Sequence, residues 1–272
     1  MNIEKVNEYM KKVTEAETKT FPYKGKLKVG LDLGTAYIVI AVLDENNQPV
    51  ACEKQSARVL RDGVVVDYLG ALEIVKKLKA KLEERLKCEL SQCAIAMPAG
   101  TQSSLKTHTY VAEGAGFEVI NILDEPSAAN SVYEIKDGVI VDIGGGTTGL
   151  AIIKNGKVEE IQDEATGGTH VTLVLSGRYH ISFEEAEVMK QDYSNHKEIF
   201  PVVKPVFEKM ASIVNKYIHD QKIKGIYLCG GTCCLTGIEE IFEKKTGIKT
   251  IKPENPFLVT PVGIAMNCVF IQ

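Results

Sequence analysis

A short segment in the middle of this sequence has the residue types of a phosphate-binding loop. An apolar run, 139–141, leads to Asp142, and after Ile143 the chain continues with Gly144, Gly145, Gly146 and Thr147. Glycines let backbone amides approach a ligand closely, and successive amides form a concave site that suits a phosphate. The pattern predicts a phosphate hairpin with Asp142 facing a metal ion or a water. A plain hairpin with a glycine-rich turn is the alternative.

A second segment near the start of the chain repeats this order of residue types. The apolar residues 29–31 lead to Asp32, which is followed by Leu33, Gly34 and Thr35 and then by the apolar run 38–40. Two such hairpins, each with an acid at the end of a strand, are far more specific than one. The pair therefore favours the phosphate site over the plain turn.

Composition sets limits on the kind of protein that presents these loops. The chain has 272 residues, of which 44% are hydrophobic and 25% charged, which is ordinary for a globular protein. The net charge of −4 and the lack of a basic stripe do not indicate nucleic-acid binding. No apolar run has membrane-spanning length and no secretion signal is visible. We expect a cytoplasmic protein without a membrane partner.

The cysteines are expected to be reduced core residues. There are seven, an odd number, and most lie in apolar runs. Cys229, Cys233 and Cys234 are close in sequence, but no nearby histidine completes a zinc site.

Apolar periodicity and turn residues predict the elements that position the loops. In the first part we expect a helix over 2–17, strands at 27–33, 36–43 and 48–57, a helix over 68–88, a strand at 92–97 ending at Pro98, a helix over 102–114, a strand at 118–123 and a helix from Glu125. In the second part we expect a hairpin over 139–153, a strand at 157–165, a helix from 167 and a further helix that begins with a capping box at Ser182–Glu185. After these we expect a helix over 201–221 that begins after Pro201 or Pro205 and a strand at 225–229. The chain should end with a helix from after Thr232 to about Lys245, a short strand at 248–251 and a last helix from Thr260. The same order of strands and helices occurs twice, which indicates an internally duplicated α/β protein.

Five short motifs in order resemble the superfamily of actin, sugar kinases and DnaK-type chaperone ATPases. They are the two phosphate loops; a first connecting helix with Glu125, Pro126, Ala128 and Ala129; an adenosine-type motif with Leu228, Gly230, Gly231 and Thr232; and a second connecting helix over 261–265. The resemblance implies a duplicated actin-like (ribonuclease H-like) fold with two lobes and a nucleotide cleft. The implied lobes are residues 24–138, completed by the C-terminal helix 259–272, and residues 139–258. Residues 1–23 are then an additional amphipathic helix and linker.

The resemblance also implies roles for individual residues and the cofactors ATP or ADP and Mg²⁺. Asp32 and Asp142 would hold Mg²⁺, since hard cations prefer oxygen ligands, and Glu125 would position the attacking water. Phosphate oxygens would accept hydrogen bonds from Gly34, Thr35 and the loop from Gly144 to Thr147. Gly230, Gly231 and Thr232 would lie against the nucleoside. Glu187 and Lys190 resemble the ribose-facing helix of bacterial actins, and a solvated helix face is the alternative.

The sequence departs from the larger members of the superfamily at three places. Gly149 stands where chaperones and cell-division actins have an acid. Chaperones place a catalytic lysine in a large insertion of the first lobe, whereas the segment 58–67 is short and contains no lysine. The outer part of the second lobe is reduced to about residues 191–201. We therefore expect both lid subdomains to be short and ATP turnover to be weak or slow.

Three further segments resemble the EutJ family of ethanolamine-utilisation proteins. They are residues 22–25, residues 124–129 and residues 167–170, within a chain of compact length. The resemblance implies a DnaK-like chaperone of ethanolamine catabolism that is associated with the bacterial microcompartment. Ethanolamine ammonia-lyase or shell proteins of the microcompartment would be its partners.

One other function stays open at this point, and two more are disfavoured by the residues present. A non-catalytic actin-like scaffold or adaptor is favoured by the missing lysine. An ATP-driven electron-transfer activator would need a cysteine before the helix at 167, and Thr166 stands there instead. A sugar kinase would need an acid placed as substrate base, and none is evident.

The N-terminal helix has two interpretations of its own. Its narrow apolar face has Ile3, Val6, Met10 and Val13, and a helix this short needs a surface to dock on. That surface is either the protein's own core or a partner.

Overall fold

The computed structural model describes residues 2–97, 102–219 and 221–269, which form two units. Unit 1 comprises Met1–Glu134 and Leu258–Gln272, and unit 2 comprises Ile135–Phe257. We describe each unit by itself. The expected strand end at Pro98 and the last three residues of the expected C-terminal helix lie outside the described residues.

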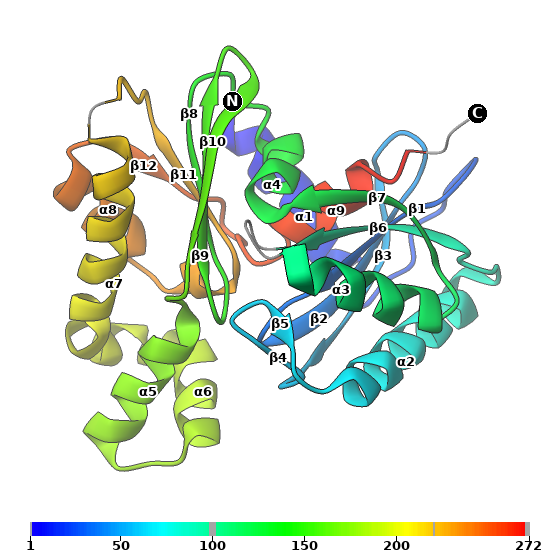
Figure 1. Ribbon diagram of the computed structural model, residues 1–272, viewed down its shortest axis with the longest axis horizontal. Helices are drawn as coiled ribbons and strands as arrows, with labels where there is room; N and C mark the ends of the chain where they lie inside the picture. Colours follow the sequence, from blue (N-terminus) through cyan, green and yellow to red (C-terminus); the bar gives the residue numbers. More distant parts are fainter. Residues whose placement is uncertain (1, 98–101, 220, 270–272) are drawn as a thin grey trace. The chain divides into compact units, whose positions relative to one another are not determined.

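Unit 1 is built on a five-stranded mixed sheet of order β3-β2-β1-β6-β7 (Figure 1). Its strands are β1 (Lys28–Leu33), β2 (Tyr37–Leu43), β3 (Pro49–Ser56), β6 (Gln92–Met97) and β7 (Glu118–Asp124). Its helices are α1 (Ile3–Glu15), α2 (Tyr68–Leu86), α3 (Gln102–Gly114), α4 (Glu125–Tyr133) and α9 (Val259–Met266). A small hairpin, β4 (Leu60–Arg61) and β5 (Val64–Val65), precedes α2.

Unit 2 repeats this plan with a sheet of order β10-β9-β8-β11-β12. The strands are β8 (Gly138–Ile143), β9 (Thr148–Lys154), β10 (Lys157–Glu164), β11 (Ile226–Cys229) and β12 (Thr250–Ile251). The helices are α5 (Gly168–Tyr179), α6 (Phe183–Gln191), α7 (His196–Ile218) and α8 (Ile238–Thr246), with 3₁₀ turns η1 (Tyr193–Asn195) and η2 (Gly231–Cys234). In both units three antiparallel strands are followed by two parallel ones. The predicted duplicated actin-like fold is confirmed.

Alternation along the first strand of each unit separates a core face from a second face. In β1, Val29 and Leu31 join a core with α2, whereas a Cβ on Gly30 would lie 2.4 Å from the backbone nitrogen of Ala265 in α9. In β8, Val139 and Val141 join a core with α5, α7 and α8. Successive strand residues point to opposite faces, so Asp142 lies on the face away from those helices.

The helix expected over 201–221 begins five residues earlier, at His196, and contains both prolines. Pro201 and Pro205 are both exposed, and as residues i and i+4 they share one side of the helix. The carbonyls that lose a hydrogen bond to proline therefore lie on the solvent side of the helix, where water can replace the missing donor. The buried side of α7 continues through the prolines as Ile199, Val203, Phe207, Met210, Val214 and Ile218. Burial of this side favours one helix over two segments.

The helix expected to run from Thr232 to Lys245 is also different. The structure has the turn η2 and then α8, with Gly237 between them at φ +86°. A left-handed residue cannot continue an α-helix, so the glycine separates the two.

The lids are short, as predicted. The segment 58–67 forms the two-residue strands β4 and β5, and η1 is the only connection between α6 and α7 within this described segment.

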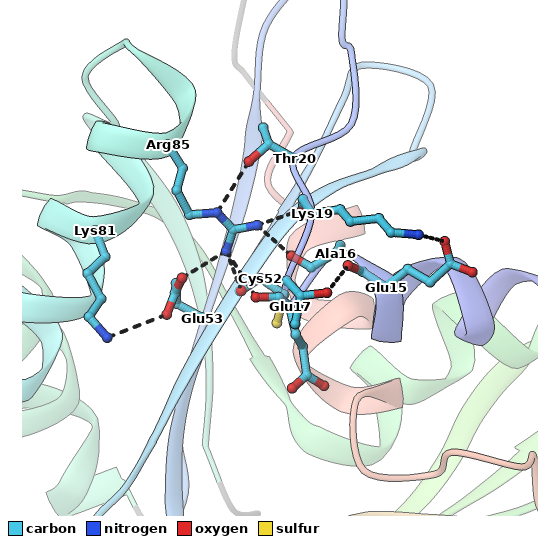
Figure 2. A network of polar contacts seen from close by, with 10 residues as sticks. Glu15, Ala16, Glu17, Lys19, Thr20, Cys52, Glu53, Lys81 and Arg85 are labelled. Carbon is cyan, nitrogen blue, oxygen red and sulfur yellow. Dashed lines mark hydrogen bonds and ion pairs between the residues drawn. The ribbon is translucent and has the colours of Figure 1, made fainter.

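The N-terminal helix α1 packs on unit 1. Its side chains Val6, Met10 and Val13 are buried, and Cys52 of β3 donates a backbone hydrogen bond to the carbonyl of Ala16. Arg85 of α2 fixes the segment that follows (Figure 2). Its guanidinium donates to four backbone carbonyls, to a hydroxyl and to the carboxylate of Glu53, the partners being Ala16, Glu17, Lys19, Cys52 and Thr20.

The seven cysteines are free thiols, and five of them are buried. Burial raises the pKa of Cys52 to about 12, which favours the neutral thiol. Among the described residues, no helix is long and apolar enough to cross a membrane.

Candidate functional site

The glycine loop of unit 2, residues 144–147, is fixed by hydrogen bonds that its carbonyls accept from neighbouring elements. The carbonyl of Gly144 accepts from the backbone amide of Gly168, at 2.9 Å, and from the hydroxyl of Thr232, at 2.7 Å. The carbonyl of Gly145 accepts from the amide of Thr169 at 2.8 Å. The start of α5 and the turn η2 therefore fix the position of this loop.

This arrangement determines where the loop amides point. In a trans peptide the carbonyl of one residue and the amide of the next point in opposite directions. The carbonyls of Gly144 and Gly145 point toward α5, so the amides of Gly145 and Gly146 point away from it. Two successive amides on one side form the kind of concave donor set that binds an anion.

Two glycines outside the loop keep this packing tight. A Cβ on Gly167 would lie 2.7 Å from the carbonyl oxygen of Gly145, and a Cβ on Gly230 would lie 2.3 Å from Oδ1 of Asp142. Gly230 also has φ +91°, where side chains are strained. The residues predicted to lie against the nucleoside, Gly230, Gly231 and Thr232, therefore lie beside the glycine loop, and the hydroxyl of Thr232 is hydrogen-bonded to it.

Asp142 has a second acid, Asp163, on the same face of the sheet. It is 4% exposed and lies opposite Gly149 of β9, which in turn lies opposite Asp163 of β10. The hydroxyl of Thr147 hydrogen-bonds to the carboxylate of Asp163. Burial, with a further contribution from the charge of Asp142, raises the pKa of Asp163 to about 7.

Glu187 and Lys190 form an internal pair on α6. The ammonium of Lys190 donates to Glu187 at 2.7 Å, to the hydroxyl of Thr172 at 2.8 Å and to the carbonyl of Gly168 at 3.3 Å. Burial lowers the pKa of Lys190, and the charge of Glu187 opposes that shift. The pair thus braces the first turn of α5 behind the loop, and its contact with a ribose stays a prediction.

Unit 1 presents its own set at one edge of its sheet. Asp32 is the fifth residue of β1, and Gly34 and Thr35 follow in the turn to β2. Glu125 begins α4 directly after β7. Strands β1, β6 and β7 are parallel, so their carboxyl ends share an edge, as at ligand sites of other parallel sheets. A Cβ on Gly34 would lie 2.7 Å from the carbonyl oxygen of Tyr37.

The two predicted connecting helices pack closely against each other. Asp124 caps α4 by accepting from the amide of Ser127 at 2.8 Å, and Pro126 lies in the first turn. A Cβ on Gly263 of α9 would lie 1.9 Å from the carbonyl oxygen of Ala128. Glycine at this position is what allows the two helix backbones to touch.

The donor set of the unit 2 loop is compatible with a magnesium ion. It offers the carboxylate of Asp142 and a buried oxygen of Asp163, Oδ1, that has no hydrogen-bond partner among the described residues. No group of three or more metal-binding side chains occurs within the described part of the chain. Mg²⁺ typically uses one or two carboxylates together with waters and substrate phosphates, so it fits this site when a phosphate is bound.

Two parts of this site were not predicted from the sequence. Asp163 gave no signal of its own, because its relation to Asp142 depends on the pairing of three strands. Gly167 and Gly168 were recognised as a helix start but not as the support of the loop. The signal available was that these two adjacent glycines follow a strand, as Gly144, Gly145 and Gly146 do.

Comparison with known proteins first defines the class. A family model described as "Type IV pilus assembly protein PilM" matches residues 126–262, and one described as "MreB/Mbl protein" matches residues 47–175. The structure of MreB5 of Spiroplasma citri bound to AMPPNP is similar, with a TM-score of 0.71 and 20% identity over 88% of this chain and 95% of that one. A shorter match, 39% identical over 103 residues, is to a chaperone HscA homolog of Pasteurella multocida, covering 35% of this chain and 16% of that protein. The fold and the loops define an actin-like ATPase superfamily member.

Two closer similarities define the family. Ethanolamine utilization protein EutJ of Salmonella typhimurium is 44% identical over 88% of this chain and 85% of its own length. The crystal structure of EutJ from Carboxydothermus hydrogenoformans has a TM-score of 0.92 and 46% identity over 98% of this chain and 99% of that one. The chain belongs to the EutJ family of ethanolamine utilization proteins.

Proposed function

We propose that this protein binds ATP or ADP with Mg²⁺ and hydrolyses ATP weakly or slowly. The observation that supports this most is the glycine loop of unit 2. Its carbonyls accept hydrogen bonds from α5 and η2, so the amides of Gly145 and Gly146 point away from α5, where they could donate hydrogen bonds to a phosphate. The AMPPNP-bound MreB5 structure, which has the same fold, also supports it.

The proposed roles of the individual groups are those that the superfamily resemblance implies. The amides of the loop and of Gly34 and Thr35 would bind phosphate oxygens, and Asp32 in unit 1 and Asp142 in unit 2 would each offer a carboxylate to the hydrated cation. A bound Mg²⁺ would neutralise charge on the phosphates during transfer. Glu125, at the start of α4, orients the attacking water. Short lids leave water access to the site, and water weakens electrostatic contacts there.

We infer further that nucleotide state controls assistance to a client in ethanolamine catabolism, as a chaperone. The family and the partial match to an HscA homolog support this. Ethanolamine ammonia-lyase and microcompartment shell proteins are the proposed partners. Co-purification and reactivation of the lyase with ATP, ADP or no nucleotide tests this step. Equal reactivation under all three conditions would exclude nucleotide control.

A non-catalytic scaffold is the second candidate function. The segment 58–67 has no lysine and forms only the two short strands β4 and β5 in the described chain, so the catalytic lysine of the chaperones has no counterpart there. Calorimetry of ATP and ADP with Mg²⁺, paired with a phosphate-release assay, separates the two. Binding with slow, Glu125-dependent release supports the ATPase, and binding without release supports the scaffold. Absence of binding contradicts both.

A further inference from the structure

Asp163 is an acid next to the phosphate loop to which neither the motifs nor the comparisons assign a role. It is the seventh residue of β10, and its Oδ1 is buried without a hydrogen-bond partner among the described residues. Its carboxylate accepts a hydrogen bond from the hydroxyl of Thr147, a residue of the loop itself.

Strand pairing puts Asp163 on the same face of the sheet as Asp142. Both lie opposite Gly149, one on each side, and directly opposed residues of antiparallel strands share a face. Two strand spacings separate their Cα atoms by about 10 Å. Gly149 has no side chain, so none stands between the two carboxylates. The charge of Asp142 raises the pKa of Asp163, as is expected for two like charges on one face of a sheet.

The hydrogen bond from Thr147 limits what its hydroxyl offers to a ligand. A hydroxyl has one proton to donate and two lone pairs that accept. When the hydroxyl donates its hydrogen bond to Asp163, the Thr147 oxygen can still accept a hydrogen bond from a water or bind a cation. It cannot at the same time donate to a phosphate oxygen.

We propose that Asp163 is a positioning residue of this site: it accepts the hydrogen bond of the Thr147 hydroxyl and so orients the lone pairs of the Thr147 oxygen toward the cation, or toward a cation-bound water, that accompanies the phosphates. The inference rests on the proposed function, since it concerns how the same loop binds Mg²⁺ together with a nucleotide. It gives Thr147 a different task from the phosphate donor that the superfamily resemblance implies. It also means that an acid on β10, Asp163, acts at this site, whereas Gly149 between it and Asp142 contributes no side chain.

The test measures the affinity for ADP by calorimetry with saturating Mg²⁺ and with EDTA. The variants are Asp163→Ala, Thr147→Val and the double variant, with Thr147→Ser as the conservative change. Glu159→Gln, on the same strand but exposed and paired with Lys154, is the matched control. The quantity compared is the ratio of the two dissociation constants, that is, the gain in affinity that Mg²⁺ provides.

We expect Asp163→Ala and Thr147→Val each to reduce this ratio about tenfold or more, with less than threefold change in EDTA. The double variant should lose little beyond either single change, because the two residues act as one unit. Thr147→Ser and the control should keep the wild-type ratio. A wild-type ratio in Asp163→Ala, or fully additive losses in the double variant, would overturn the inference. If Asp163→Ala does not fold, the Thr147→Val and Thr147→Ser pair decides, and equal ratios in those two refute it. A wild type that binds no ADP under either condition contradicts the proposed function instead.

Discussion

Replacing Asp163 by asparagine should make the protein more stable at alkaline pH. Burial and the nearby charge of Asp142 raise the pKa of Asp163 from 3.8 to about 7, so the folded protein binds this proton more tightly than the unfolded chain does. Ionising the group in the folded state therefore costs free energy. At 1.36 kcal/mol per tenfold change the shift corresponds to about 4 kcal/mol at pH 8.

The expected gain is smaller, because the side chain is only partly buried and water screens its charge. We expect Asp163→Asn to raise the free energy of unfolding by about 1–2 kcal/mol at pH 8, or the Tm by roughly 2–8 °C. The asparagine oxygen still accepts from Thr147, so the loop keeps its hydrogen bond. The gain comes from removing the charge.

The assay is urea unfolding of the wild type and Asp163→Asn, without nucleotide, at pH 4.5 and pH 8. A raised carboxylate pKa stabilises the fold at low pH, and this stability is lost as the pH rises from about 4 to about 7. The advantage of the variant should therefore be large at pH 8 and small at pH 4.5. Glu159→Gln is the control. An equal or lower stability of Asp163→Asn at pH 8, or the same advantage at both pH values, would refute the reasoning.

Three further substitutions test other parts of the fold. Arg85→Ala should lower the free energy of unfolding by about 3–5 kcal/mol, because it leaves Glu53 and several carbonyls without their donor. The control Lys81→Ala removes an exposed ammonium 3.8 Å from Glu53 and should change the free energy of unfolding by less than about 0.5 kcal/mol. Equal effects of the two substitutions would show that Arg85 does not hold this segment in place. Gly263→Ala should lower the free energy of unfolding by about 3 kcal/mol or more, since its Cβ would overlap the carbonyl of Ala128. The control Gly177→Ala, in open space on α5, should leave the stability unchanged or raise it. Thermal unfolding compares the two variants, and wild-type stability of Gly263→Ala would contradict the close packing of α4 and α9. Burial lowers the pKa of His196, whose Nδ1 accepts from the amide of Thr236, so the neutral ring contributes fully to folding stability above about pH 6.5 and this stability is lost as the pH falls toward the folded pKa. The difference in stability between the wild type and His196→Gln should therefore shrink between pH 7.5 and pH 5 in urea unfolding. A constant difference would argue against a neutral ring in the folded protein.

Most of the fold was predictable because its signals are local. Strand β6 and helix α3 have the predicted bounds, since apolar periodicity and flanking glycines or prolines determine such elements. The capping box of Ser182 and Glu185 forms as expected. The start of α7 was missed because proline was interpreted as a helix start, although the apolar spacing from Ile199 to Val203 already continued past it.

The site was predictable only as far as its residues are neighbours in sequence. Asp142 and the glycines after it predict a phosphate loop, because one short segment contains both the acid and the backbone donors. The bonds from Gly168 and Thr232 to the carbonyl of Gly144 join residues 24 and 88 positions apart, and no local pattern specifies them. The partnership of Asp163 with Thr147 likewise exists only once β9 has paired with both of its neighbours.

Titration calorimetry of ADP with Mg²⁺ on wild type, Gly145→Val and Gly177→Ala tests the central claim most directly. We expect a side chain on Gly145 to stand where the phosphate would approach the loop amides, whereas a Cβ on Gly177 of α5 would meet open space. The account predicts saturable binding by wild type and Gly177→Ala, and a loss of at least about tenfold in affinity for a folded Gly145→Val. Wild-type affinity in Gly145→Val would mean that the hairpin is a turn and not a phosphate site.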